Sequence, residues 1–379
     1  MSGNEMKYIQ EAFDTNWVVP LGPNVNGFEE DLEAYVGQGK KVVALSAGTA
    51  AVHLAMVALG VGKGDEVLCQ SFTFAASSNP ATYQGATPVF IGSEAKTWNM
   101  DPNKLEDAIK DRIQKTGRKP KAIVPVYLYG MPAYIDDILE IARRYDIPVI
   151  EDAAEAFGSK YKGQMTGTFG HFGVMSFNGN KMITTSGGGA LICPDEATKK
   201  KIMFYATQAR ENRPYYLHEE IGYNYRMSNV CAGIGRGQMT VADDHVRHHQ
   251  RIARMYADAF ADHEVIRFHG SPEDYMEPNY WLSTITFETA ESNKPRPEGA
   301  DLEPCPLVMK AMEALMAEGI ESRPLWRPMH TQPVYREAPA YVSGISEFFF
   351  RKGLCLPSGP CVTDNDVERV VTILKSCVK

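Results

Sequence analysis

The sequence lacks the patterns that would indicate a disulfide-bonded or zinc-binding protein. Its seven cysteines are an odd number, lie far apart and form no C-x-x-C pair, so we expect reduced thiols and a cytoplasmic location. The chain begins without an apolar signal core, and no uninterrupted apolar run reaches the length needed to cross a membrane. These absences predict a soluble protein without a membrane partner.

Positive charge is also scarce. The 39 lysines and arginines are outnumbered by 47 aspartates and glutamates, which gives a net charge of −8 at pH 7. That balance argues against a nucleic-acid partner, although a local group of arginines could still bind an anionic small molecule. No G-x-G-x-x-G motif opens a strand–helix–strand unit, which argues against a Rossmann-type dehydrogenase.

The histidines do not indicate a metal centre. His53 falls in a helical pattern as a packed residue, and we expect His245, His248 and His249 to form the solvated face of a long polar helix. No cysteines or convergent carboxylates accompany them, so we predict no metal site.

Short apolar strands alternate with amphipathic helices through the first half of the chain. In the helix expected at 101–113, for example, Leu105, Ala108, Ile109 and Ile113 share one stripe. Strands this apolar are usually covered on both faces, so we predict an α/β fold with a three-layer, mainly parallel sheet. The expected strands are 41–45, 66–70, 87–92, 121–130, 147–152, 172–177 and 189–194.

The pattern changes near residue 240, and from there we predict a smaller α+β domain. The boundary divides the chain into a large domain at 1–242 and a small C-terminal domain at 243–379. The expected elements of the second part are a long helix at 241–263, a strand at 279–288, a Pro- and Glu-rich stretch at 294–306, a helix at 307–319 and a last helix from Thr363 or Asp364.

Three short motifs carry chemical groups. "SAGTAA" lies between a strand and a helix, where Gly48 and Thr49 could hold a phosphate. Asp152 ends an apolar strand, and Lys181 lies in the loop of "SFNGNKMITTSGGGAL", after Ser176 and before three glycines. Each has an ordinary alternative: a helix cap, a capping aspartate and a solvated surface lysine.

Together, the three motifs fit one cofactor. Pyridoxal phosphate needs a seat for its phosphate, an acid beside its ring nitrogen and an amine that can form a Schiff base. The order of a phosphate turn, then Asp152, then Lys181 makes the joint interpretation far stronger than any single motif.

Longer motifs give the chain a family resemblance. "SFTFAAS", "EDAAEAFGS", "SFNGNKMITTSGGGAL", "GYNYRMSN" and "ESRPLWRPMHTQPVY" resemble the DegT/StrS family of nucleotide-sugar aminotransferases, which have fold-type I and use pyridoxal phosphate. Within that family, the chain most resembles the transaminases that make UDP-4-amino-4,6-dideoxy-N-acetylglucosamine in bacillosamine-type pathways.

The resemblance implies a role for each matching residue. Lys181 would be the Schiff-base lysine, Asp152 would pair with the pyridine nitrogen, and Phe74 would stack on the ring. Glu155 stands near the expected position of the ring hydroxyl, where many relatives carry Gln or His. Residues implied to hold the phosphate are Gly48, Thr49 and Ser176, with Asn224 reaching the phosphate of a neighbouring subunit in a homodimer with shared active sites.

The implied reaction moves an amino group from L-glutamate to C4 of a UDP-4-keto-6-deoxy-N-acetylhexosamine. The alternatives are another keto-sugar nucleotide, either 3-keto or dTDP-linked, and a regulator that binds the cofactor without turnover. The candidate substrate contacts are Asn178, Arg213, Arg226, Arg327 and His330. For each arginine, a structural ion pair is an equally good interpretation.

Overall fold

A computed structural model describes residues 1–294 and 301–378. Its centre is a sheet in two four-stranded parts, ordered β1-β9-β8-β5 and β14-β3-β2-β4. Bridges from Ile123 to Val149 and from Val126 to Asp152 join the two parts through β4 and β5. The strands are β1 (Lys41–Leu45), β2 (Glu66–Gln70), β3 (Thr87–Ile91), β4 (Ala122–Val124), β5 (Ile150–Asp152), β8 (Phe172–Ser176), β9 (Gly189–Cys193) and β14 (Ala340–Tyr341).

The predicted α/β fold with a mainly parallel sheet is confirmed. The pairs β5–β8, β2–β4, β2–β3 and β3–β14 are parallel. The exception is β9, which pairs antiparallel with both β8 and β1. β9 follows β8 through a loop that contains no helix, which favours an antiparallel return, and this hairpin loop carries Lys181.

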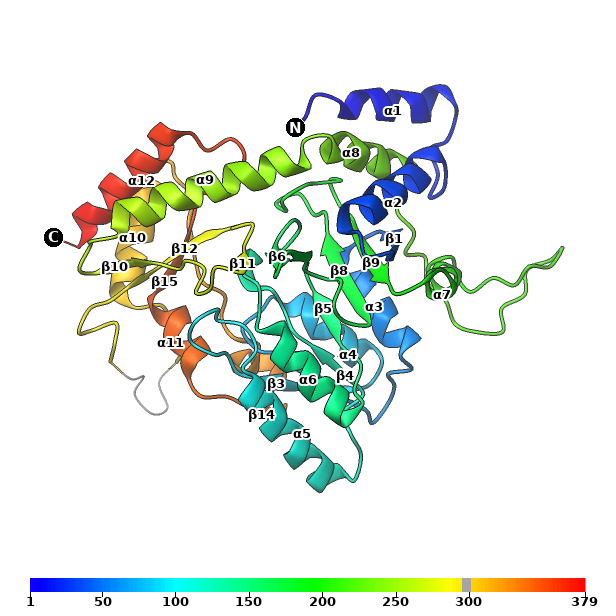
Figure 1. Ribbon diagram of the computed structural model, residues 1–379, viewed down its shortest axis with the longest axis horizontal. Helices are drawn as coiled ribbons and strands as arrows, with labels where there is room; N and C mark the ends of the chain where they lie inside the picture. Colours follow the sequence, from blue (N-terminus) through cyan, green and yellow to red (C-terminus); the bar gives the residue numbers. More distant parts are fainter. Residues whose placement is uncertain (295–300, 379) are drawn as a thin grey trace.

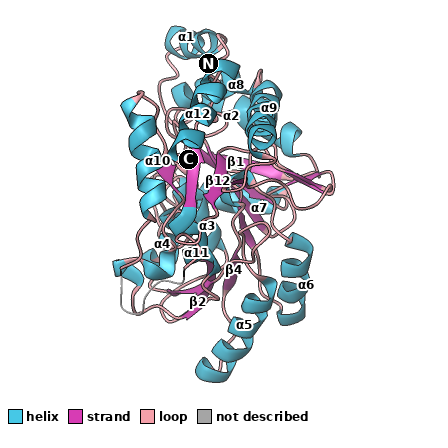
Figure 2. Ribbon diagram, turned by 90° about the vertical axis from the view of Figure 1, so that its left-hand side faces the viewer, coloured by secondary structure: helices cyan, strands magenta, loops and turns pink. Residues whose placement is uncertain are grey.

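Helices cover both faces of the sheet (Figure 2). Neighbouring residues of β2 point to opposite faces, and they belong to two different cores. Val67 and Cys69 pack in the core that contains α3, α4 and α7, whereas Leu68 packs in the core that contains α5 and α6. The bounds are α3 (Gly48–Ala58), α4 (Asn79–Tyr83), α5 (Pro102–Thr116), α6 (Ile135–Tyr145) and α7 (Glu196–Ala206).

A second, antiparallel sheet of order β10-β12-β15-β13 forms the C-terminal part. It shares one core with the helices α9, α10 and α12. Helix α9 runs from α8 to this part along the top of the molecule (Figure 1). The bounds are α9 (Ala242–Phe260), β10 (Ile266–Phe268), β12 (Ser283–Phe287), α10 (Pro306–Ala317), β13 (Arg323–Pro324), α11 (Ile345–Lys352), β15 (Gly353–Leu356) and α12 (Asp364–Cys377).

The remaining elements lie around these two sheets. Helices α1 and α2 pack on α8, and a long segment between α7 and α8 projects from the body (Figure 1). A small sheet has the order β11-β6-β7. The bounds are α1 (Glu5–Asp14), α2 (Pro23–Val36), β6 (Lys160–Tyr161), β7 (Gln164–Met165), α8 (Asn229–Met239) and β11 (Met276–Glu277).

The predicted boundary at 242/243 stays a prediction, and α9 begins beside it. Two strands from beyond the boundary pair with strands that precede it, since β14 extends the large sheet at β3 and β11 pairs with β6. Segment 329–341 is therefore attached to the large sheet. Residues 295–300 of the predicted Pro- and Glu-rich stretch lie outside the described residues.

Two predictions about local structure are wrong. The strand expected at 121–130 ends at Val124, because Pro125 has no N–H to continue the ladder. The histidines of α9 do not form a solvated face: His245 is 9% exposed and His249 is 3% exposed. His53 is packed as predicted. Within the described ranges, no helix combines the length and apolar character of a membrane span.

Candidate active site

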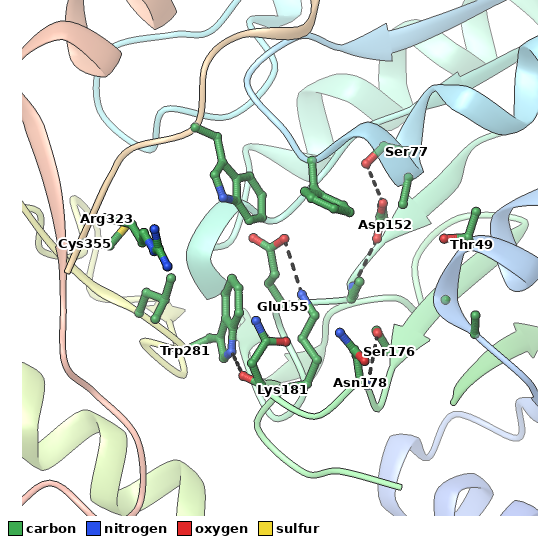
Figure 3. A pocket seen from close by; sticks show the side chains of 18 of the residues that line it. Thr49, Ser77, Asp152, Glu155, Ser176, Asn178, Lys181, Trp281, Arg323 and Cys355 are labelled. Carbon is green, nitrogen blue, oxygen red and sulfur yellow. Dashed lines mark hydrogen bonds and ion pairs between the residues drawn. The ribbon is translucent and has the colours of Figure 1, made fainter. Parts of the chain in front are cut away.

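Eight of the predicted site residues line one cavity of about 620 Å³ (Figure 3). The cavity lies where β5 and β8 end, which is the edge at which ligands bind in open α/β sheets. Strands β5 and β8 end at Asp152 and Ser176, and the loop between β8 and β9 supplies Lys181. The eight residues are Gly48, Thr49, Phe74, Asp152, Glu155, Ser176, Asn178 and Lys181.

Lys181 is largely enclosed, with a side chain 13% exposed. Its Nζ lies 3.7 Å from Glu155 Oε1 and 4.0 Å from the centre of the Trp281 ring. The neighbours of Lys181 along the sequence are neutral, but the fold brings a carboxylate to its amine from another segment.

Asp152 is a buried carboxylate, 4% exposed. Its Oδ2 accepts a hydrogen bond from Ser77 Oγ at 2.6 Å, and its Oδ1 accepts one from the Ala154 N–H at 3.1 Å. Burial raises the pKa of Asp152, and these hydrogen bonds oppose the rise. A protonated ring nitrogen in the cavity would give this carboxylate the cationic partner that a buried charge needs.

Glu155 is also 4% exposed. Burial raises its pKa to about 7, while the Lys181 ammonium and a hydrogen bond from the Tyr129 N–H act in the opposite direction. That hydrogen bond joins Tyr129 N to Glu155 Oε2 at 2.7 Å. Glu155 can therefore gain or lose a proton near neutral pH.

The start of α3 forms a cradle for an anion. Gly48 and Thr49 are its first two residues, whose N–H groups have no partner inside the helix. Gly189 faces them across the sheet so closely that a Cβ there would lie 2.3 Å from Gly48 N. Ser176 is opposite, with its Cβ 3.1 Å from where a Cβ on Gly48 would be. The residues present fit pyridoxal phosphate: a cradle at one end, Asp152 on the floor and Lys181 within the same cavity.

The structure does not bring the other predicted residues into this cavity. Arg226 is 7% exposed and ion-paired with Glu29. His330 lies between Ser71 Oγ, 2.6 Å from Nδ1, and Glu347 Oε1, 2.9 Å from Nε2. Neither side chain lines this cavity, and their predicted substrate contacts stay predictions.

Asn224, Arg213 and Arg327 lie elsewhere. Asn224 pairs with Thr207 at the base of the projecting segment, and Arg213 is exposed within that segment. Arg327 lines a neighbouring cavity of about 870 Å³ that shares Phe74 and Trp326 with the first. Their predicted roles stay predictions.

The cavity is also lined by residues outside the predicted set, among them Ser77, Trp281 and Trp326. Ser77 stands three residues after Phe74 in "SFTFAAS", the motif already assigned to the cofactor ring. Its hydroxyl could therefore have been predicted to lie at the site. Trp326, expected as core or pocket wall, lies 5.6 Å from Phe74 and 6.1 Å from Trp281 between ring centres. Trp281 comes from the second part of the chain, and nothing local to it indicates the cavity.

This site and fold define a class of enzyme. A lysine amine, a buried carboxylate and a helix N-terminus, gathered at the carboxyl edge of a mainly parallel sheet, are the arrangement of a fold-type I enzyme that uses pyridoxal phosphate.

The chain belongs to the DegT/DnrJ/EryC1/StrS aminotransferase family, whose profile matches residues 1–375. It is therefore an aminotransferase, and its cofactor is pyridoxal phosphate. It is 46% identical over 379 residues to EpsN of Bacillus subtilis (strain 168), whose name describes a pyridoxal phosphate-dependent aminotransferase, with 99% of this chain and 93% of EpsN covered.

Two further relatives span nearly the whole chain. GDP-perosamine synthase of Escherichia coli O157:H7 is 36% identical, with 99% of this chain and 95% of the synthase covered. The crystal structure of a DegT DnrJ EryC1 StrS aminotransferase from Brucella abortus superposes with a TM-score of 0.89 at 28% identity, covering 99% of this chain and 95% of that one.

Proposed function

We propose that this aminotransferase moves the amino group of L-glutamate to C4 of a UDP-4-keto-6-deoxy-N-acetylhexosamine, giving a UDP-4-amino-4,6-dideoxy sugar for surface glycan synthesis. The observation that carries the proposal is the meeting of Lys181, Asp152 and the start of α3 in one cavity. The cavity has room beside these groups, and its second wall comes from the C-terminal part of the chain.

The residues have separate tasks in this reaction. Pyridoxal phosphate, when bound, supplies a ring that withdraws electrons from the substrate carbon next to the nitrogen. The Gly48 and Thr49 N–H groups and the Ser176 hydroxyl would hold its phosphate, and Phe74 would cover one face of its ring. Asp152, which accepts a hydrogen bond from Ser77, would accept another from the ring nitrogen and keep that nitrogen protonated.

Lys181 is the proton carrier. Its Nζ takes a proton from the α-carbon of glutamate in the first half-reaction and returns one to C4 of the sugar in the second. Glu155, 3.7 Å away, would hold the Lys181 amine in place while it carries the proton. Asn178, which lines the same cavity, would contact the substrate.

A GDP-linked keto sugar is the second candidate. Two relatives at 36% and 37% identity carry the name GDP-perosamine synthase, and perosamine is a 4-amino sugar. Both candidates share a 4-keto group and differ in the nucleotide, so the acceptor test must include both.

We further propose a cytoplasmic homodimer with shared active sites. Apolar side chains are exposed in two regions that support an interface: Met6 (65%) and Phe13 (58%) on α1, and Tyr216 (80%) and Ile221 (82%) on the projecting segment. Asn224 lies at the base of that segment, from which it would reach a partner's phosphate. All seven cysteines are free thiols, as is usual in a reducing compartment.

The test uses the two halves of the reaction separately. With glutamate alone, the purified enzyme should lose its visible cofactor absorbance and release 2-oxoglutarate. UDP- and GDP-linked 4-keto-6-deoxy sugars are then added in parallel, and the products are identified by mass spectrometry and NMR. Lys181→Ala is the matched control. Conversion of the GDP sugar alone would replace the first candidate with the second, and a glutamate reaction without conversion of either would refute both.

The dimer is tested independently by light scattering. We expect the mass of two chains for the wild type. An Ile221→Asp variant should shift toward one chain and lose cofactor faster. A monomeric wild-type enzyme with full activity would refute the shared site.

A further inference from the structure

The carbonyl groups of the two residues that flank Lys181 are held by ring nitrogens from outside its loop. The carbonyl of Asn180 accepts a hydrogen bond from Trp281 Nε1 at 2.7 Å. The carbonyl of Met182 lies 3.1 Å from His245 Nδ1. Since a carbonyl can only accept, His245 carries its proton on Nδ1. The backbone that presents the lysine is thus fixed at the residue before it and the residue after it.

A second histidine holds the tryptophan. His249, one turn after His245 on α9, has its Nδ1 3.1 Å from the carbonyl of Tyr280, the residue before Trp281. Tyr280 has φ +51°, a conformation that is unfavourable for a bulky residue and persists only when its surroundings hold it. The hydrogen bond from His249 is one such constraint, so it indirectly fixes the ring under Lys181.

Both histidines are suited to a permanent hydrogen bond. They are buried, and neither lines the cavity. Burial lowers the pKa of His249 to about 4, an effect reinforced by the neighbouring His248 and His245. His249 is therefore neutral near pH 7. A single helix face reaches both the lysine loop and the segment that carries Trp281.

We propose that His245 and His249 are positioning residues that fix the height and direction of the Lys181 amine above the Trp281 ring. The inference rests on the proposed function, in which Lys181 carries the cofactor. His245 acts through the Met182 carbonyl, and His249 acts through Tyr280 and Trp281. Together they make α9, the helix that leads into the C-terminal part, a support for the reactive lysine.

The variants are chosen by where they place a donor. Asparagine puts its amide nitrogen at the bond position of Nδ1, glutamine puts it one bond further out, and phenylalanine keeps a ring without a donor. Each is made at His245 and at His249. His248→Asn is the matched control, because His248 lies on the same helix and its Nε2 has no hydrogen-bond partner among the described residues.

The principal readout is the visible absorbance and circular dichroism of the lysine-bound cofactor, titrated with pH in the absence of substrate. We expect the phenylalanine variants to shift the titration midpoint by about one pH unit, since the amine is no longer held at its distance from the Glu155 carboxylate. They should also lower kcat for the glutamate half-reaction by about 10- to 100-fold while KM changes little, because a misplaced amine affects the chemical step. The asparagine variants should recover most of the wild-type behaviour, and His248→Asn should match the wild type.

Wild-type titration and kcat in the phenylalanine variants would overturn the proposal. If those variants do not fold, the glutamine variants decide: a shifted titration relative to asparagine supports the proposal, and identical behaviour of the two overturns it. The spectroscopic readout needs no sugar acceptor, so it is independent of the substrate assignment. Cofactor that can still be fixed covalently to the chain by borohydride reduction in Lys181→Ala would refute the lysine assignment itself.

Discussion

The substitution Glu155→Gln tests whether the buried carboxylate of the site lowers the free energy of unfolding of the protein. Glutamine keeps the shape of the side chain and can still accept the hydrogen bond from Tyr129 N, but it cannot ionise. Burial raises the pKa of Glu155 from 4.5 to about 7. This difference in pKa means that ionising Glu155 costs roughly 3 kcal/mol more in the folded protein than in the unfolded chain.

The sign of the effect follows from proton binding. Between pH 4.5 and about 7, the folded protein binds the Glu155 proton more tightly than the unfolded chain does. The free energy of unfolding of the cofactor-free protein therefore falls as pH rises through that window, and the loss is complete above it. Glutamine cannot ionise, so the variant does not lose this stability. We expect its free energy of unfolding to exceed that of the wild type by up to about 3 kcal/mol at pH 8 and by little at pH 4.5.

Denaturant unfolding of both cofactor-free proteins at several pH values measures this difference. Glu30→Gln, an exposed position on α2, is the matched control and should show no pH-dependent gain. A gain of equal size at pH 4.5 and pH 8, or a variant less stable than the wild type at pH 8, would refute the reasoning. Either result would mean that the charged form of Glu155 is not the costly one.

Three further perturbations have equally defined outcomes. Lys181→Ala should keep the fold, measured by far-UV circular dichroism, while losing turnover and the visible cofactor absorbance. Gly189→Ala should weaken cofactor binding by about tenfold or more in a fluorescence titration, because its Cβ would lie 2.3 Å from Gly48 N; Gly187→Ala, which meets nothing within 4 Å, should bind normally. Arg226→Met should lower the free energy of unfolding by about 3 kcal/mol, since it removes a close cationic partner of the buried Glu29. The Arg226→Met/Glu29→Gln double variant should recover much of that loss, and a single variant as stable as the wild type would show that the ion pair is not needed.

The predictable parts of this protein are those that short stretches of sequence determine. The amphipathic stripe of 101–113, the turn at Gly48 and the strand end at Asp152 each appear in the structure where the sequence places them. Lys181 is likewise expected in the loop after β8, and the structure places that loop at the edge of the sheet where β5 ends at Asp152. Strand and helix periodicity, with local turn chemistry, suffices for these features.

The unpredicted parts are contacts between distant segments. Trp281 donates a hydrogen bond to the Lys181 loop from a position 101 residues away in the sequence, and Arg226 pairs with Glu29 from a position 197 residues away. A charge in a sequence does not reveal whether another segment will neutralise it, so an arginine in a conspicuous motif could not be distinguished from a structural ion pair. The burial of His245 is similar. Helix α9 is polar in composition, but one of its faces packs against the Lys181 loop, and only the tertiary structure shows that contact.

The pairing of β14 with β3 has a consequence for how the protein is made. The edge of the large sheet at β3 is closed by residues 340–341, some 250 residues later in synthesis. On the ribosome, that edge stays open until most of the chain has been translated, and unpaired strand edges are templates for aggregation. Chains that end prematurely between β12 and β14 should therefore form most of the large sheet but leave the β3 edge unpaired. We expect such chains to aggregate through that edge, whether or not they could form an active site.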